Sequence, residues 1–487
     1  MENKMRVMLI SPSITSYKKN LKRIIPPMSL GYLGAVIRGE FSINILDAAL
    51  EGYKNERAID KELMVYGLED SEIEQRIANF RPKVVGVTLP FSSQVNNSIN
   101  ICKIAKKNNS NIKTVVGGIH ASVMYEDVLE NKEIDFVVIG EGEKTLLELC
   151  RNIRDNKSIE GIKGLSYKVN GKVLVTGKRK LILNPDELPF PARDIMNMDK
   201  YFKINIPHGS YAKGNCVGSV LTSRGCPGVC TYCSSHVVAG YKFRARSAEN
   251  VLAEIEELVN KYNVNEIQFE DDNLTFDKER AVTLFQGMKK FNLIWCTPNG
   301  ISINAIDFEL LKLMKESGCY QLTFGIESGS EYVLHNLMKK NIDLGKVKPV
   351  IKELKRLGIG THLFFIVGMP GETKAQMKET FRYARYLNPD SASFAIANPL
   401  PGSVMYRKCI ETACLKEGFK FSDTIYRKSN IKLNDFGCRE FENWVDKKNY
   451  YFNVSLMFRN PIKFIKKYVN FIIKKPKLIL KLFGKNA

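Results

Sequence analysis

Residues 223–234 constrain this chain more than any other segment. Their sequence, Ser-Arg-Gly-Cys-Pro-Gly-Val-Cys-Thr-Tyr-Cys-Ser, holds Cys226, Cys230 and Cys233 at the spacing C-x-x-x-C-x-x-C, after an apolar run that predicts a strand. Clustered thiolates favour zinc or an iron–sulfur cluster. A structural zinc normally has four protein ligands. His236 could be the fourth, but an iron–sulfur cluster with one open iron fits three cysteines better.

This loop resembles the cysteine loop of the radical S-adenosylmethionine (SAM) superfamily. The resemblance is carried by the three cysteines and by Tyr232, the aromatic residue before the last of them. It implies that the cysteines hold a [4Fe-4S] cluster whose fourth iron is chelated by SAM. The form Arg-Gly-Cys-Pro-x-x-Cys-x-Tyr-Cys resembles the subgroup with an N-terminal cobalamin domain, which includes class B methylases and anaerobic magnesium-protoporphyrin cyclases.

Length and cysteine usage indicate a multidomain protein of a reducing compartment. The 487 residues are enough for two to four domains of roughly 100–200 residues each. Eleven cysteines are present, and those outside the loop are scattered, which is typical of free thiols rather than a disulfide framework. The N-terminus lacks a signal-peptide pattern, and no apolar run reaches about 18 residues. We therefore expect a cytoplasmic protein.

The first 150 residues predict a doubly wound (Rossmann-like) α/β domain. Apolar runs at 5–10, 43–47, 84–89, 114–118 and 136–139 alternate with helical segments, as in a parallel sheet with helices on both faces. Ligands of such sheets bind at the carboxyl ends of the strands. Glycine-marked strand ends occur at 117–121 and 140–143.

This first domain resembles the cobalamin-binding domain that precedes many radical SAM enzymes. The matching residues are Pro26-Pro27, Gly117-Gly118-x-His120-Ala121 and the Gly-Glu-Gly-Glu run at 140–143. The resemblance implies that Gly117, Gly118, His120 and Glu141 lie against cobalamin. The D-x-H-x-x-G loop, whose histidine ligates cobalt in other cobalamin domains, is absent. We therefore expect His120 to pack or hydrogen-bond rather than to bind cobalt; a domain that has lost its cofactor is the alternative.

A hairpin and a linker are predicted between 151 and 211, with an Asn-Gly turn at 170–171. From 212 to 425, six strand–helix units predict a partial (β/α)6 barrel, with its chemistry on loops at the carboxyl ends of the strands. The expected strands are 217–221, 266–270, 293–297, 321–326, 361–367 and 391–396.

Several residues at these strand ends are candidates to bind SAM. By resemblance, Asp271 and Asp272 accept hydrogen bonds from the methionine ammonium, although an Asp-Asp-Asn run is also a common helix N-cap. Asn299 could reach the methionine carboxylate. Glu327 could contact the ribose or the carboxylate, or could form an ion pair at the barrel mouth. Gly368 would allow the backbone to approach the adenine.

The C-terminal region, 426–487, predicts a helical and strongly basic segment. The net charge is +21, and residues 447–487 contain eleven Lys and Arg and no Asp or Glu. Apolar residues at helical spacing from 459 to 476 indicate an interfacial helix that brings the protein to the inner face of a membrane. The alternative is a helix docked on the barrel. Nucleic acid is not expected, because no RNA-binding module accompanies the charge.

The residues and the resemblance together indicate a cobalamin-dependent radical SAM enzyme. We expect it to methylate, or otherwise modify through a radical, an unactivated carbon of a lipid or natural-product molecule. A flavodoxin or ferredoxin type reductant would supply electrons. One alternative is a tRNA methylthiotransferase-like enzyme, which needs three cysteines in its N-terminal domain where this chain has Cys102 and Cys150. The other is a non-catalytic cobalamin- or metal-binding protein.

Overall fold

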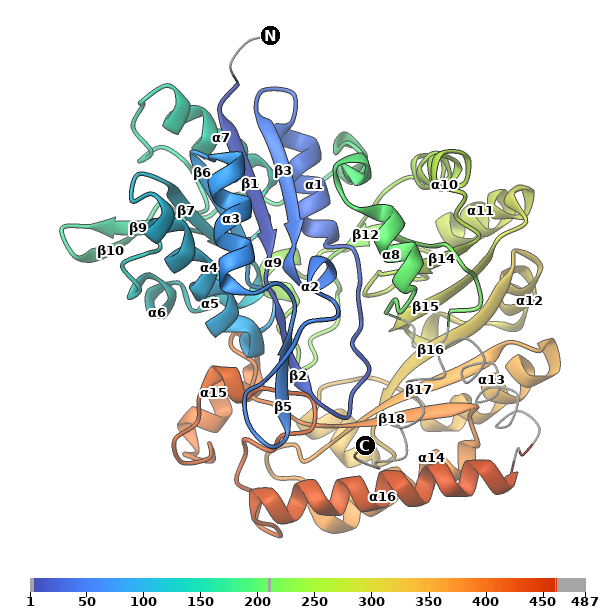
Figure 1. Ribbon diagram of the computed structural model, residues 1–487. Coiled ribbons are helices and arrows are strands. Elements are labelled where there is room, and N and C mark those ends of the chain that lie inside the picture. Colours follow the sequence, from blue (N-terminus) through green and yellow to red (C-terminus); the bar gives the residue numbers. More distant parts are fainter. Residues whose placement is uncertain (1–3, 209–211, 460, 462–487) are drawn as a thin grey trace. The chain divides into compact units, whose positions relative to one another are not determined.

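A computed structural model describes residues 4–208, 212–459 and 461. The chain forms two compact units. The first comprises Met1–Ile204 together with Ser234–Gly240, and the second comprises Asn205–Cys233 together with Tyr241–Ala487. Figure 1 shows the elements of each unit along the chain.

The first unit is built on a seven-stranded sheet of order β10-β9-β8-β7-β6-β1-β3. Five strands are parallel, and chain order reverses at β1, as the doubly wound fold requires. The hairpin pairs antiparallel with β8, so the sheet is mixed. The strands are β1 (Arg6–Ser11), β3 (Ser42–Asp47), β6 (Val84–Thr88), β7 (Lys113–Gly117), β8 (Phe136–Val138), β9 (Leu165–Val169) and β10 (Lys172–Val175).

Two apolar cores cover the two faces of this sheet. Helices α3 (Asp70–Phe80) and α4 (Val95–Asn108) contribute Ile73, Ile77 and Ile101 to one core. Helices α1 (Met28–Ile37) and α7 (Glu143–Arg154) contribute Leu30, Leu146 and other residues to the opposite core. Burial on both faces explains why the strands are nearly continuous apolar runs.

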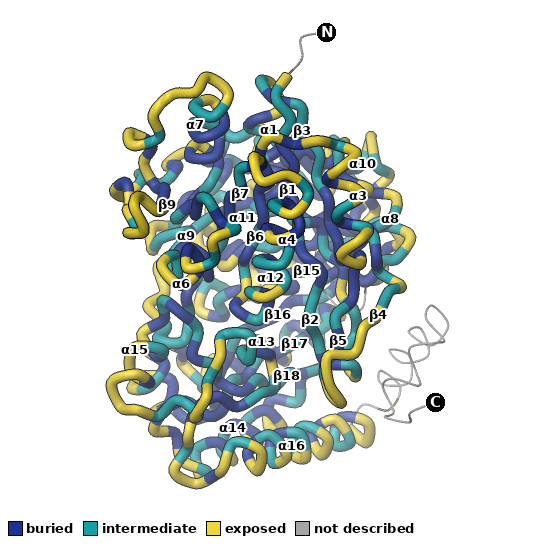
Figure 2. Tube along the Cα trace, turned by 60° about the vertical axis from the view of Figure 1, so that its left-hand side comes forward, coloured by how far each residue is buried: buried dark blue, intermediate teal, exposed yellow. Residues whose placement is uncertain are grey.

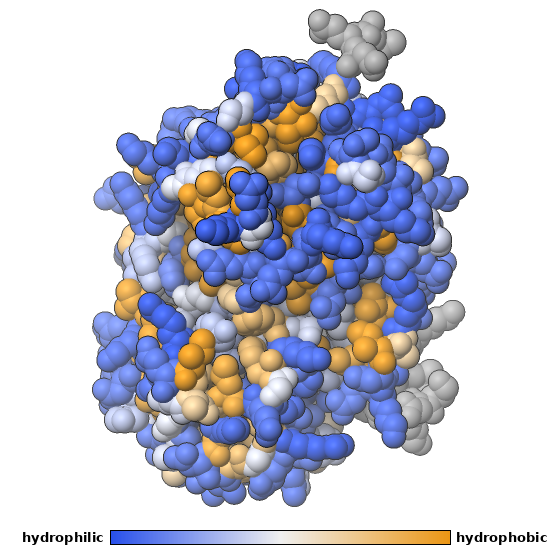
Figure 3. All heavy atoms as spheres, turned by 90° about the vertical axis from the view of Figure 1, so that its left-hand side faces the viewer, coloured by the Kyte–Doolittle hydropathy of each residue, from blue (hydrophilic) through white to orange (hydrophobic). Residues whose placement is uncertain are grey.

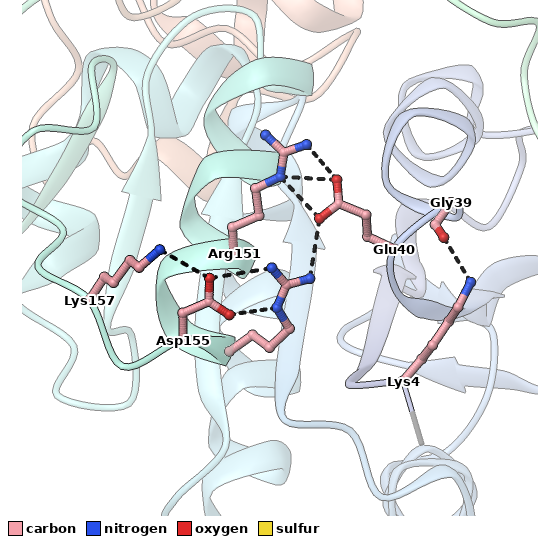
Figure 4. Close-up of polar contacts among 7 residues, drawn as sticks. Lys4, Gly39, Glu40, Arg151, Asp155 and Lys157 are labelled. Atoms are coloured by element: carbon pink, nitrogen blue, oxygen red, sulfur yellow. Dashed lines mark hydrogen bonds and ion pairs between the residues drawn. The ribbon is translucent and has the colours of Figure 1, made fainter. Parts of the chain in front are cut away.

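Ion pairs fasten the outer helices of the first unit. Arg151 on α7 pairs with Glu40, which lies shortly after α1 in the chain, and Arg154 pairs with both Glu40 and Asp155 (Figure 4). Lys4 donates a hydrogen bond of 2.7 Å to the carbonyl of Gly39. These groups are partly exposed, so each pair stabilises the fold only slightly.

Short elements complete the first unit. A three-stranded antiparallel sheet of order β2-β5-β4 was not predicted. It consists of β2 (Ile14–Tyr17), β4 (Glu56–Ala58) and β5 (Leu63–Tyr66). The short helices are α2 (Ala48–Glu51), α5 (Ile119–Val123), α6 (Tyr125–Leu129), α8 (Met198–Ile204) and α9 (His236–Ala239).

The second unit contains a six-stranded parallel sheet in simple sequential order. Its strands are β11 (Val217–Val220), β14 (Glu266–Phe269), β15 (Ile294–Ile301), β16 (Cys319–Glu327), β17 (Gly360–Val367) and β18 (Ser391–Ile396). This confirms the predicted doubly wound domain followed by a partial barrel. The third strand runs further than expected, through a register irregularity between Thr297 and Ile301.

Helices cover the outer side of this sheet. They are α10 (Ala248–Tyr262), α11 (Lys278–Met288), α12 (Phe308–Glu316), α13 (Leu344–Leu357), α14 (Lys374–Leu387) and α16 (Cys438–Arg459), whereas α15 (Val404–Glu411) is a short helix that follows β18 in the chain. Phe365 and Phe394 stack on each other, and Phe394 also contacts Phe381 of α14 and Phe452 of α16. These rings therefore mark the outer face of β17 and β18.

The C-terminal helix α16 has a mixed surface (Figure 2). Phe441 and Phe452 are buried, whereas Tyr450 and Phe458 are exposed.

No helix among the described residues is long and apolar enough to cross a bilayer. The face shown in Figure 3 is mainly hydrophilic, with small groups of apolar side chains. Most of the predicted basic amphipathic helix at 459–476 lies outside the described residues.

Gly118, at the end of β7, is the tightest backbone position on the carboxyl edge of the first sheet. Its φ is +125°, and a Cβ there would lie 2.5 Å from the carbonyl oxygen of Leu89. We expect Gly118→Ala to lower the free energy of unfolding by about 1–3 kcal/mol or more, because the backbone conformation is essentially restricted to glycine. Gly117→Ala is the matched control, since its Cβ would meet nothing closer than 3.7 Å. Equal urea midpoints for the two variants would show that the backbone at Gly118 tolerates a side chain.

Candidate active site

The cysteine loop begins just after the carboxyl end of β11, where hydrogen bonds to a buried carboxylate anchor it. The buried carboxylate of Asp271 accepts hydrogen bonds from the backbone N–H of Thr222 at 3.1 Å and from its hydroxyl at 2.7 Å. The Ser223 hydroxyl donates to the same carboxylate. Burial raises the pKa of the Asp271 carboxyl, while the hydrogen bonds from Ser223 and Thr222 oppose that shift. Asp271 is therefore a brace that joins the ends of β11 and β14.

The expected alternative for Asp271 and Asp272, a helix N-cap, is not what the structure shows. Helix α11 is capped by Asp277, whose carboxylate accepts a hydrogen bond from the Arg280 N–H at 3.0 Å. Asp272 is exposed, and its charge acts on Cys226. The two neighbouring carboxylates thus have different surroundings, one within the fold and one facing the thiols.

A second set of hydrogen bonds holds the loop at Thr231, between Cys230 and Tyr232. The Thr231 N–H donates to the Met338 carbonyl at 2.9 Å, and its hydroxyl donates to the Leu337 carbonyl at 2.7 Å. The Thr231 carbonyl accepts from the Met405 N–H at 2.8 Å. The loop is therefore fixed by segments that follow β16 and β18.

The three thiols of the loop are half-buried and close to one another, and none forms a disulfide. A Cβ on Gly228 would lie 3.4 Å from the sulfur of Cys226 and 3.7 Å from that of Cys230. Burial raises the pKa of both thiols; the neighbouring cysteines add to the effect. Within the described residues, no three His, Cys, Asp or Glu side chains are grouped so as to hold a single metal ion. A [4Fe-4S] cluster suits this donor set, because each thiolate binds a different iron.

Asn299 and Glu270 meet at the neighbouring strand ends. The Asn299 side-chain amide donates to the Glu270 carbonyl at 2.7 Å. The Glu270 carboxylate lies 2.8 Å from Nδ1 of His208 and accepts from the Ser219 hydroxyl at 3.4 Å. Sequence reasoning did not single out His208, because nothing in its local pattern links it to the end of β14.

Glu327 forms the ion pair that was the alternative to a ligand contact. Its carboxylate lies 2.8 Å from the ammonium of Lys340, and its φ is +67°, an unusual value for a residue other than glycine. Burial alone would lower the pKa of the Lys340 ammonium, but Glu327 and the Cys230 thiol raise it overall. Lys340 carries a positive charge beside the cysteines, and the sequence pattern did not reveal it.

Gly368 lies at a crowded turn after β17. Its φ is +86°, and a Cβ would lie 2.6 Å from the ring of Phe441. The N–H groups of Gly368 and Met369 donate to the buried carboxylate of Glu372 at 2.7 and 2.9 Å. Burial raises the pKa of the Glu372 carboxyl to about 7. The glycine is thus required by packing against α16, independently of any adenine.

The inner face of β17 and β18 is half-buried and mixed, with polar side chains toward the amino ends of the strands and Phe364 and Ile366 further along β17. On these strands the side chains that alternate with the outward Phe365 and Phe394 include His362, Ser391 and Ser393. Nδ1 of His362 lies 2.8 Å from the Ser391 hydroxyl, and its Nε2 lies 3.1 Å from that of Ser393. The sequence pattern did not indicate this histidine either.

In the first unit, the predicted cobalamin residues lie at the carboxyl edge of the sheet. Gly117 ends β7, and His120 lies on α5 with its Nδ1 2.8 Å from the Ser92 hydroxyl. Burial lowers the pKa of the His120 imidazole to about 4, so the ring is neutral at physiological pH. The Glu141 carboxylate accepts a hydrogen bond of 2.8 Å from the Ile182 N–H.

Comparisons with known proteins match this architecture. Residues 220–384 match the model of the radical SAM superfamily, and residues 15–150 match the B12 binding domain. The cytidylyl-2-hydroxyethylphosphonate methyltransferase of Streptomyces wedmorensis is 36% identical over 83% of this chain and 82% of its own length. The chain belongs to the radical SAM superfamily. Its first unit contains the B12 binding domain, matched over residues 15–150.

Other relatives agree with this placement. The anaerobic magnesium-protoporphyrin IX monomethyl ester cyclase of Rubrivivax gelatinosus is 28% identical over 83% of this chain and 70% of its own length. A solved structure of TsrM, a radical SAM methyltransferase from Kitasatospora setae, has a TM-score of 0.68, 19% identity, and covers 84% of this chain and 77% of its own. OxsB, a cobalamin-dependent radical SAM enzyme, has a TM-score of 0.73 and 15% identity, and the match covers 99% of this chain and 72% of the OxsB chain. These structures share the fold.

Membership of this group establishes the cofactors. This radical SAM chain uses a [4Fe-4S] cluster, S-adenosylmethionine and cobalamin, as predicted, and is an enzyme of the cobalamin-dependent, methyltransferase-like kind. The first of the three functional hypotheses is therefore confirmed at the level of cofactors and reaction group.

Proposed function

We propose that this radical SAM enzyme transfers a methyl group to an unactivated carbon of a small natural-product molecule. The observation that carries the proposal is the cysteine loop, which protein hydrogen bonds hold at its start and at Thr231. Cys226, Cys230 and Cys233 would hold the cluster. When bound, the cofactors supply the radical that removes hydrogen and the methyl group that replaces it. A flavodoxin or ferredoxin type protein is the proposed electron source.

In this proposal the chain's own residues position SAM. Asp272, beside Cys226, suits the methionine ammonium, whereas Asp271 acts one step back because its oxygens are engaged by Thr222 and Ser223. Asn299 is exposed at the next strand end, where it would receive the methionine carboxylate. Glu327 would contact the ribose, and the Gly368 turn would lie along the adenine.

Replacing any of the three loop cysteines with serine should remove the cluster, because a hydroxyl is a far poorer iron ligand than a thiolate. We expect wild-type protein, reconstituted anaerobically with iron and cobalamin, to form 5′-deoxyadenosine and S-adenosylhomocysteine. The Cys226→Ser, Cys230→Ser and Cys233→Ser variants should form neither and should lose the cluster's visible absorbance.

Cys216→Ser is the control, since this partly exposed thiol lies outside the loop. Retention of both properties by all three loop variants would refute the ligand assignment. Formation of 5′-deoxyadenosine without S-adenosylhomocysteine would refute methyl transfer and indicate another radical outcome.

We also propose that cobalamin lies over Gly117 and Gly118 without a cobalt bond from His120. Support comes from the neutral, buried imidazole paired with Ser92 and from the missing D-x-H-x-x-G loop. Glu141, which already accepts a hydrogen bond from the backbone of Ile182, would shape the same edge.

Electron paramagnetic resonance of the cob(II)alamin form tests this assignment. We expect a spectrum without nitrogen superhyperfine splitting in the wild type and in His120→Ala alike, because no imidazole would bind cobalt. Nitrogen splitting that disappears in His120→Ala would place the imidazole on cobalt and refute the proposal.

The substrate is proposed to be a polar small molecule. Relatives carry names that specify a cytidylyl phosphonate, a bacteriochlorophyllide and a hopanoid as substrates. His362, Ser391 and Ser393 add imidazole and hydroxyl groups to an inner face that also carries Phe364 and Ile366. Such a face suits a substrate that has hydrogen-bonding groups beside apolar ones.

A membrane-associated lipid substrate is the second candidate. Its support is the acid-free basic sequence from 447 onward and the exposed Tyr450 and Phe458 on the outer side of α16. Aromatic and basic side chains together favour an anionic membrane interface.

Liposome flotation separates these candidates. If the second holds, full-length protein should float with anionic vesicles, and less so at high salt because the charge attraction is screened. A chain that ends at Phe458 should remain in the lower fraction. If neither chain floats, the lipid candidate loses its support and the polar one remains; if both float equally, the segment after Phe458 has no part in membrane binding.

A further inference from the structure

Lys340 brings a fixed positive charge to the cysteine loop. Its ammonium lies 2.8 Å from the Glu327 carboxylate and makes a long contact of 3.5 Å with the Tyr232 hydroxyl. Its side chain is 23% exposed, so water screens the charge only in part. The Lys340 N–H donates to the Leu334 carbonyl at 2.9 Å, which fixes the start of the side chain.

A glycine at position 325 and an unfavourable backbone conformation at Glu327 accommodate this ion pair. A Cβ on Gly325 would lie 2.4 Å from the Glu327 carboxylate and 3.0 Å from the Lys340 ammonium. Glu327 itself adopts a left-handed backbone conformation, which is unfavourable for a side chain of this kind. Strained backbone that persists next to a cofactor site motivates a functional explanation.

Lys340 and the cysteine loop are joined by several bonds. Tyr232, whose hydroxyl Lys340 contacts, lies within the loop between Cys230 and Cys233. Thr231 donates hydrogen bonds to the carbonyls of Leu337 and Met338, just before the lysine.

We propose that Lys340 is a positioning residue that raises the reduction potential of the cluster, with Glu327 limiting the size of the effect. This rests on the proposed ligation by Cys226, Cys230 and Cys233. A low-potential protein reductant supplies one electron, converting [4Fe-4S]2+ to [4Fe-4S]+ without bond breakage. With three thiolates the centre is anionic, and the electron adds negative charge. A nearby cation therefore stabilises the reduced form more than the oxidised form.

The charge-sign test uses midpoint potentials of reconstituted full-length protein without SAM, measured by redox titration with paramagnetic resonance detection. Lys340→Gln should shift the potential down, and Glu327→Gln should shift it up. Lys340→Arg should remain close to wild type. The double variant Lys340→Gln/Glu327→Gln should fall between the two single variants, because it loses both of the opposed charges.

Lys339→Gln is the matched control, since it removes the same charge from the adjacent exposed residue. Equal shifts in Lys339→Gln and Lys340→Gln, or downward shifts in both Lys340→Gln and Glu327→Gln, would overturn the proposal and leave a purely structural ion pair. Iron and sulfide content is measured on every sample. Wild-type protein that binds no cluster would overturn the cysteine assignment as well, whereas a full cluster with unshifted potentials overturns the role of Lys340 alone.

Discussion

The buried carboxylate of Asp271 is the contact on which the cluster side of this enzyme depends. It satisfies the N–H and hydroxyl of Thr222 and the hydroxyl of Ser223 at the point where β11 ends and the cysteine loop begins. Without it these donors would be buried and unpaired, which costs about 1–3 kcal/mol for each group. The anion in turn is tolerated inside the fold because several donors surround it. These hydrogen bonds therefore set the direction in which the cysteine loop leaves the sheet.

The two units apply the same principle with different residues. In both, the carboxyl ends of parallel strands collect the groups that face cofactors, and glycine is required where backbones approach closely, at Gly118 in one and at Gly368 in the other. The polar groups there are largely engaged within the protein, as His120 is with Ser92 and Glu327 is with Lys340. Contacts within the protein therefore contribute to the positions of the side chains at both edges.

The features that the sequence predicted have signatures within a few neighbouring residues. Most of the features that it missed depend on contacts between segments far apart in the chain. The cysteines, the glycine turns and the hairpin at β9 and β10 have short-range signatures, and all the main strands are apolar runs. Lys340 and His362 have no such signature, because their roles depend on contacts with other segments of the chain. Near Lys340, for example, Leu337 bonds to Thr231 of the cysteine loop, 106 residues away in the sequence. The sheet of β2, β5 and β4 was missed because its strands have only 3 or 4 residues. Asp271 was predicted to bind SAM; the structure shows its carboxylate engaged by Thr222 and Ser223, and contact with SAM stays a prediction.

The double clamp on the cysteine loop also bears on damage by oxygen. Iron–sulfur clusters that bind a substrate through an open iron are exposed to oxidants, and their loss would leave a loop of half-buried thiols. Here Asp271 holds the start of the loop and Thr231 holds its middle, through hydrogen bonds that involve no iron. Because these bonds do not depend on the cluster, we expect the backbone path of the loop to survive its loss. Repair would then require delivery of iron and sulfide, and not refolding of the barrel.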